Sequence, residues 1–156
     1  MPNHCYNRVT IYGSGNDTDE TRTQIAKLKD IFEGENVFPQ IIPEPDWANT
    51  PLMSKDVSYW LHDKRGEVGE LPVDGRFLST DLADDRWYDW RLQNWDTKWD
   101  AYDLTVVDED PDQLEVTFNT AWSPPEAVCS AIREQYPDLA VSWFFDEPGC
   151  EIAGYL

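Results

Sequence analysis

The side chains that most often carry out chemistry are few in this chain and lie far apart. Its two histidines are His4 and His62, and the motifs of serine hydrolases, P-loop proteins, dinucleotide-binding proteins and zinc peptidases are absent. The three cysteines, Cys5, Cys129 and Cys150, lack the paired spacing of zinc or redox sites. We therefore predict a protein that is not an enzyme and has no catalytic residue, metal site or cofactor. A metal site of His4, Cys5 and Cys150 is an alternative that requires the two ends of the chain to meet.

The charge of the chain is strongly negative. It has 31 Asp and Glu residues against 12 Lys and Arg residues, which gives a formal net charge of -19 at pH 7. Proteins bind nucleic acids and anionic lipid surfaces mainly through Lys and Arg, so both should repel this chain. We therefore expect a basic protein partner and no direct contact with nucleic acid or membrane.

Acidic residues are concentrated between Asp81 and Asp112, where eleven of them accompany three basic residues. The predicted partner-binding acidic face consists of Asp81, Asp84, Asp85, Asp89, Asp108, Glu109, Asp110 and Asp112. On a helix, carboxylates about 5 to 6 Å apart would form a row that imitates the charge spacing of a nucleic acid. Such a mimic would occupy the nucleic-acid site of a host protein. Adaptation for solubility in salt explains the same composition, and the sequence leaves both explanations open.

Two blocks rich in tryptophan and polar residues form the second candidate site. The residues that we single out in them are Asn94, Trp95, Thr97, Lys98, Trp99, Thr120, Trp122 and Ser123. In one interpretation they form a ligand platform, with Trp faces for stacking and Lys98 against an aromatic ring. In the other they form a structural corner, in which Trp95 and Trp99 close the end of the helix layer and Thr97 and Lys98 hold the loop.

The length and the hydrophobic pattern predict one domain over residues 1–156, with an insertion at about 35–101. Residues 5–12 alternate between apolar and polar positions, which predicts a strand. Apolar residues at helical intervals predict a helix over 18–32. Between 35 and 79, repeated Pro and Gly residues exclude a long regular element, and a second helix is expected from about Asp81.

The second half of the chain continues the same alternation of strands and helices. Further strands are expected at residues 102–107, 114–121, 139–145 and 151–155, with an acidic loop over 108–113. Ser123-Pro124-Pro125-Glu126 places Ser at an N-cap and Pro at the first helical position, which predicts a helix to about Gln135. The order is βαββαβ. We therefore predict an α+β, ferredoxin-like antiparallel sheet with two helices on one face, a long irregular insertion after the first helix and an extra C-terminal strand.

Four blocks of the sequence, taken together, carry a resemblance. They are MPNHCYNRVTI at residues 1–11, NWDTKWDA at 94–101, FNTAWSPP at 118–125, and EPG at 147–149 followed by Ala153-Gly154. In this order they resemble the Api92-like family, whose domain is also called the YubB ferredoxin-like domain. The resemblance implies a ferredoxin-like fold and an origin in phages or plasmids, and it implies no activity. Asp96 departs from the family pattern, where a Gly is expected, so a tight turn with positive φ is in question there.

These observations together favour a non-enzymatic accessory protein of a phage or other mobile element. We expect it to bind a basic, nucleic-acid-binding host protein through its acidic surface, in the reducing cytoplasm of the host cell. No signal peptide or apolar membrane span is recognisable in the sequence. The alternatives are a small-ligand or carbohydrate-binding module that uses the Trp-rich segment, and a structural virion component. The sequence does not indicate an oligomeric state.

Overall fold

The computed structural model describes residues 3–14, 18–47 and 86–156, without the side chains of residues 108 and 109. Its described elements, in chain order, are β1 (His4–Gly13), α1 (Thr18–Glu33), α2 (Val37–Ile41), α4 (Arg86–Asn94), β2 (Tyr102–Asp110), β3 (Gln113–Ala121), α5 (Glu126–Gln135), β4 (Leu139–Glu147) and β5 (Ile152–Tyr155). The chain divides into two units, one formed by residues 1–43 and 90–156 and the other by residues 44–89. The expected start of a helix at Asp81 lies outside the described residues.

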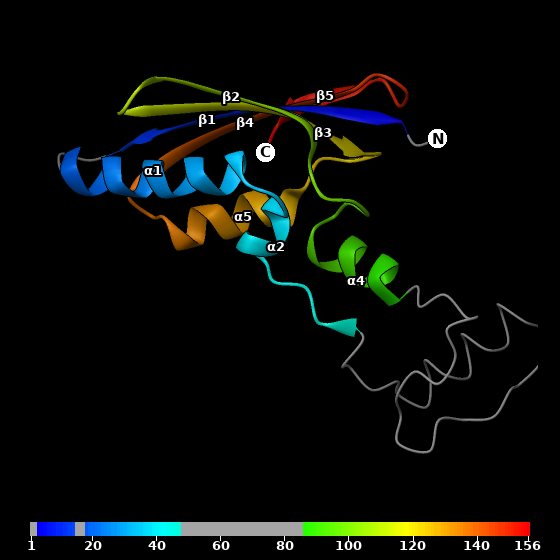
Figure 1. Ribbon diagram of the computed structural model, residues 1–156. Helices are drawn as coiled ribbons and strands as arrows, with labels where there is room; N and C mark the ends of the chain where they lie inside the picture. Colours follow the sequence, from blue (N-terminus) through cyan, green and yellow to red (C-terminus); the bar gives the residue numbers. More distant parts are fainter. Residues whose placement is uncertain (1–2, 15–17, 48–85) are drawn as a thin grey trace, which may run out of the picture. The chain divides into compact units, whose positions relative to one another are not determined.

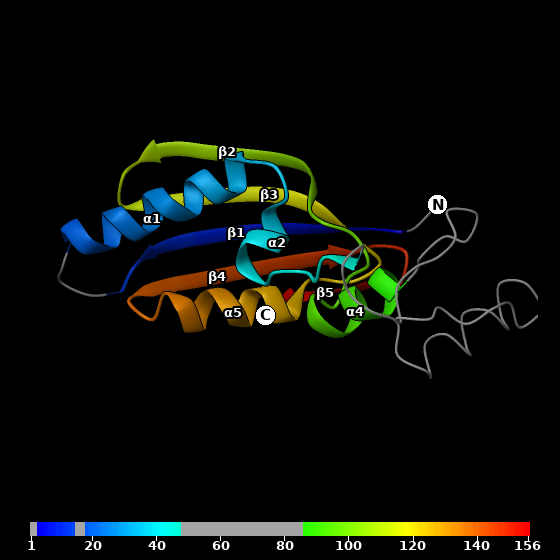
Figure 2. The same ribbon diagram turned by 60° about the horizontal axis from the view of Figure 1, so that its bottom comes forward.

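The larger unit contains a five-stranded antiparallel sheet with the strand order β2-β3-β1-β4-β5. The helices α1, α2 and α5 lie on one face of this sheet (Figure 1). Seen from the helix side, α1 runs along β2 and β3, and α5 runs along β4 (Figure 2). This arrangement confirms the predicted ferredoxin-like fold with its extra C-terminal strand.

The core forms between the sheet and the helices because each element buries one side. In β1 the residues Cys5, Asn7, Val9 and Ile11 are buried while their neighbours face outwards, as the alternation predicts. The helices bury residues at helical spacing. These residues are Ile25, Leu28 and Phe32 in α1 and Val128, Cys129 and Ile132 in α5. Trp143 of β4 is fully buried against them and meets Phe118 edge to face. The core residues of β1, α1 and α5 therefore occupy the positions that their apolar spacing indicates.

The β2–β3 hairpin differs from the expected one. An acidic loop was predicted over residues 108–113, but the strands continue to Asp110 and resume at Gln113, so that Pro111 and Asp112 alone form the turn. Pairing across the strands outweighs the low strand propensity of Asp and Glu. At the turn, the Arg22 side chain of α1 donates two hydrogen bonds to the Asp112 carboxylate, at 2.6 and 3.0 Å.

The short helix α2 lies inside the stretch that was predicted to be irregular. The Asp100 carboxylate accepts a hydrogen bond from the backbone N–H of Phe38, 2.9 Å away, at the first turn of this helix. At its other end, the side chains of Trp95 and Gln135 donate hydrogen bonds to the carbonyl groups of Ile42 and Ile41. A helix of this length is unstable alone, so these three distant side chains explain why it forms.

Helix α5 begins and ends close to the predicted residues, but its N-cap was predicted wrongly. The capping position is occupied by Pro125, which makes no side-chain hydrogen bond to the helix. Among the described residues, no helix is long and apolar enough to cross a membrane. The cysteines Cys5, Cys129 and Cys150 are all free thiols, the first two buried and the third exposed.

Candidate functional site

The two Trp-containing blocks meet in a corner formed by residues 94–100 and 120–127. The Ser123 hydroxyl donates a hydrogen bond to the Asp96 carbonyl, and the Thr97 hydroxyl donates one of 2.9 Å to the Ala121 carbonyl. The Asp96 carboxylate accepts a hydrogen bond of 2.8 Å from the backbone N–H of Ala127, in the first turn of α5. Asp96 has a φ of 64°, so the tight turn with positive φ is retained although the residue is not Gly.

The Trp rings of this corner serve different purposes. Trp95 is fully buried, packs against Phe38, and donates its indole N–H to a backbone carbonyl. Trp99 is 39 % exposed, and the Lys98 ammonium lies 4.6 Å from the centre of its ring. Trp122 is exposed and has a φ of 71°. A stacking platform needs several exposed rings, whereas Trp95 lies within the core, so the geometry of Trp95 is that of a structural corner.

Asn94 and Thr120 also act within the structure. The Asn94 amide donates a hydrogen bond of 2.8 Å to the Trp90 carbonyl inside α4. The Thr120 hydroxyl accepts a hydrogen bond from Asn7 and donates one to the Ser123 carbonyl. Asn7 in turn accepts the indole N–H of Trp143, so the buried polar groups of this network are paired with one another.

The predicted acidic face is described only in part. Asp81, Asp84 and Asp85 lie outside the described residues, as do the side chains of Asp108 and Glu109. Asp89 is exposed and belongs to the unit of residues 44–89. Asp110 and Asp112 are exposed at the tip of the β2–β3 hairpin, where the ion pair with Arg22 lowers the pKa of Asp112. Of the eight predicted residues, the described structure therefore brings these two together.

The face of the sheet opposite α1, α2 and α5, which we call the open face, has no described helix of this unit upon it. It carries side chains that alternate with the buried ones. The aromatic and polar residues among them include Tyr6, Arg8, Thr10, Tyr12, Gln113, Glu115, Thr117, Phe144 and Tyr155. The tyrosines Tyr6, Tyr12 and Tyr155 are exposed, by 39 %, 44 % and 67 %. None of these residues belongs to a catalytic or metal-binding motif of the sequence, although the period of two in β1 and β3 predicts that those of each strand share one side.

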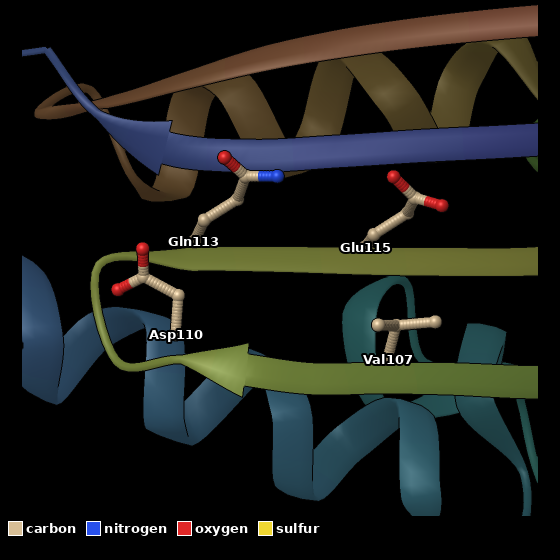
Figure 3. Close-up of a pocket in the computed structure, with 4 residues that line it drawn as sticks. All are labelled: Val107, Asp110, Gln113 and Glu115. Atoms are coloured by element: carbon tan, nitrogen blue, oxygen red, sulfur yellow. The ribbon is translucent and has the colours of Figure 1, made fainter.

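A pocket opens on this face beside the hairpin, with a volume of about 320 Å³. It is lined by Val107 and Asp110 of β2 and by Gln113 and Glu115 of β3, whose side chains stand on the near side of the two strands in Figure 3. In the register of the sheet, Val107 pairs with Glu115 and Asp110 pairs with Gln113. The pocket therefore has two carboxylates, one amide and one apolar wall.

Side chains of the neighbouring strand β1 lie beside the pocket. Tyr12 pairs with Gln113 and Thr10 pairs with Glu115, so both side chains lie on the open face next to the pocket. Further along β1, the Arg8 guanidinium lies 5.4 Å from the centre of the Phe144 ring, which meets Tyr155 edge to face. The open face thus has an acidic end at the hairpin and an aromatic end that carries the cation Arg8 and the carboxylate Asp146.

No group of three His, Cys, Asp or Glu side chains among the described residues is arranged to hold a metal ion. Cys150 is exposed after β4 and its backbone N–H donates a hydrogen bond to the Glu147 carboxylate. That carboxylate also raises the pKa of the Cys150 thiol by accepting its hydrogen bond. A hydrogen bond to the carboxylate favours the neutral thiol, which is the less reactive form.

The geometry defines a ferredoxin-like domain with an open sheet face. Comparison with protein families matches residues 94–156 to the ferredoxin-like domain in Api92-like protein. The match covers less than half of the chain and agrees with the resemblance found in the sequence. Among solved structures, the chain is similar to the protein api92 from Yersinia pseudotuberculosis, with 10 % identity and a TM-score of 0.50 over 99 % of this chain and 93 % of that one. At this identity the likeness concerns the fold. A comparison with curated proteins found no match.

Proposed function

We propose that this protein is a non-enzymatic accessory protein of a phage or other mobile element that acts by binding a basic protein of the host. The observation that carries the proposal is the pocket on the open face, whose polar lining consists of Asp110, Glu115 and Gln113. The lining of this pocket holds no Lys or Arg, and the whole chain has a net charge of -19. Electrostatic attraction would accelerate association with a basic partner and would favour it over acidic ones.

A nucleic-acid-binding protein is the form of partner that we propose. Its binding surface is basic, and an acidic protein that occupies it excludes the nucleic acid by competition. The protein would then act as an inhibitor or mimic in the host cytoplasm. Exposed tyrosines on the open face, such as Tyr6 and Tyr12, supply the contact area that protein interfaces use.

The test is a binding titration of the full chain against a panel of small basic nucleic-acid-binding proteins of the host, at low and at moderate salt. We expect binding that weakens steeply as salt rises, and competition by duplex DNA for the same partner. Binding that does not respond to salt, or direct binding of the protein to duplex DNA, would contradict the proposal.

The Trp-rich ligand-binding module is less well supported. That function needs at least two Trp faces along one open cleft. Trp95 is fully buried and makes its indole hydrogen bond inside the fold, which leaves Trp99 and Trp122 as the exposed rings of this corner. A structural role in the virion would instead be detected as a fixed copy number of the protein in purified particles.

A further inference from the structure

We infer that the pocket between Val107, Asp110, Gln113 and Glu115 receives one lysine or arginine side chain of the partner. This inference rests on the proposed function and deepens it, because it places the recognition of the basic partner at four residues on the open face. The occupant is the cationic side chain of a segment that lies along the outside of β2 and β3.

The charges around the pocket favour a cation. Asp110 and Glu115 supply two carboxylates on adjacent strands. One oxygen of Asp110 accepts the backbone N–H of Asp112 at 2.9 Å, which leaves its other oxygen for a ligand. The positive charge of Arg22 is engaged mainly by Asp112, through two hydrogen bonds, and interacts more weakly with Asp110. The pocket therefore keeps a negative potential that an incoming ammonium or guanidinium group would neutralise.

The shape of the pocket suits one long side chain. Its volume of about 320 Å³ is at the lower end of the range of ligand pockets, which begins at roughly 300 Å³. Val107 gives an apolar wall for the aliphatic stem of Lys or Arg. Tyr12, which is 44 % exposed beside Gln113, offers a ring for a cation–π contact at the rim.

The pocket is built on two paired strands, with an irregularity in their register between Val107 and Asp110. The turn between the strands contacts α1 through the half-exposed ion pair of Arg22 and Asp112. Sites on sheet strands keep their geometry better than sites on loops.

The rest of the open face explains why the cation should enter at this end. Arg8 lies four residues before Tyr12 on β1, about 13 Å away along an extended strand. Its guanidinium over the Phe144 ring would repel a second cation there. The Phe144 end holds one cation, Arg8, and one carboxylate, Asp146, whereas the hairpin end holds the two carboxylates of the pocket, so the hairpin end favours a basic side chain more strongly.

The experiment uses fluorescently labelled hexalysine and hexaarginine peptides and the full chain. Binding is measured by anisotropy for the wild type, for the double variant Asp110→Asn/Glu115→Gln, and for the matched double variant Asp30→Asn/Glu134→Gln. Both variants remove two negative charges. Asp30 and Glu134 are exposed on α1 and α5, the helices that cover the opposite face. We expect the pocket variant to weaken binding by about tenfold or more and the matched variant by less than about twofold.

A second measurement needs no variant. Titration of the isotope-labelled wild type with each peptide should move the backbone amide resonances of Val107, Gln113 and Glu115 more than those of α1 and α5. The two peptides distinguish Lys from Arg as the preferred side chain. Equal weakening by both double variants, with resonance changes spread over the surface, would overturn the inference while leaving the proposed function standing. Absence of salt-sensitive binding to any basic protein would overturn both.

Discussion

The carboxylate of Asp96 caps the helix α5 through the backbone N–H of Ala127, 2.8 Å away and 31 residues later in the chain. A helix N-terminus normally obtains this hydrogen bond from the residue that immediately precedes it. Here that residue is Pro125, which has no side-chain acceptor, and Asp96 replaces it from across the corner. The negative charge of Asp96 also suits the positive end of the helix dipole. Asp96 therefore links the family block at residues 94–101 to the helix that follows β3.

Substitutions of Asp96 separate the contribution of its helix cap from the cost of its positive φ. Asp96→Ala loses the cap and places a Cβ-bearing residue without a polar side chain at a φ of 64°, so we expect a loss of about 2 kcal/mol in the free energy of unfolding. Asp96→Gly loses only the cap and should cost about 1 kcal/mol. Asp96→Asn keeps an acceptor and should cost least. Urea unfolding followed by Trp fluorescence measures all three, and equal losses for Ala and Gly would show that φ is unimportant here.

The ionisation of Asp100 should make the protein less stable as pH rises. Burial raises the pKa of this carboxyl group, although its hydrogen bonds from the N–H groups of Phe38 and Ala101 lower it in part. The unfolded chain therefore releases this proton first, from a pKa of about 3.9. The contribution of the protonated Asp100 carboxyl group to the stability is fully present below that value, and it is lost as pH rises through the pKa of the folded state.

The comparison that isolates Asp100 is with Asp100→Asn, which does not ionise. The free energy of unfolding of the wild type minus that of the variant should fall as pH rises from 3 to 7. A difference that is constant over this range would contradict a raised pKa for Asp100.

Asp112 should show the opposite dependence on pH. The hydrogen bonds from Arg22 lower the pKa of its carboxyl group below its usual range. Its contribution to stability is therefore present above the unfolded pKa and is lost as pH falls through the folded pKa. Both side chains are about half exposed, so the contribution is small.

The direct test is an NMR titration of the Asp112 carboxyl group. In Arg22→Gln its pKa should return to the ordinary value, whereas Lys29→Gln, which removes a different cation of the same helix, should leave it low. An unchanged pKa in Arg22→Gln would show that the ion pair does not form in solution.

A side chain at Gly149 should displace the Asn3 amide. A Cβ atom built on Gly149 would overlap the Asn3 side-chain amide and lie 3.0 Å from a Glu147 carboxylate oxygen. Because the overlapping group is the end of a side chain that can move, Gly149→Ala should cost about 1 kcal/mol in the free energy of unfolding. Asn3→Ala removes the main obstacle, so the double variant Asn3→Ala/Gly149→Ala should recover much of that loss. If a double-mutant cycle showed no coupling between the two substitutions, the contact with Asn3 would be excluded as the cause of the lost stability.

Among the three thiols, Cys150 should react alone in the folded protein. Cys5 and Cys129 are buried, and burial raises the pKa of Cys5 to about 11. Labelling with iodoacetamide at pH 8 should modify one thiol per native chain and three in urea, counted by mass spectrometry. Glu147→Gln removes the carboxylate that raises the pKa of Cys150, so it should label faster than the wild type. Rapid labelling of Cys129 in the native state would show that its part of α5 opens.

Prediction from sequence succeeded where the residues of one short segment are enough to determine its secondary structure. The strand at Cys5 and the helix at Thr18 follow from apolar spacing alone, and the end of α5 before Pro137 follows from the restriction that proline places on the preceding residue. Prediction failed at Ser123, because the local capping pattern competed with a distant acceptor. The acidic hairpin was predicted as a long loop for a similar reason, since strand pairing is not a property of residues 108–113 alone.

The sequence by itself determined the fold class and the order of the strands and of helices α1 and α5, because hydrophobic periods of two and of 3.6 residues are local. Only the tertiary structure decided which polar groups meet. Arg22 and Asp112 are 90 residues apart in the chain, and Asp96 and Ala127 are 31 apart. The pocket likewise exists because the register of β2 and β3 sets Val107 beside Glu115 and Asp110 beside Gln113. Such pairs depend on strand register and helix placement, which the spacing of residues along one segment does not encode.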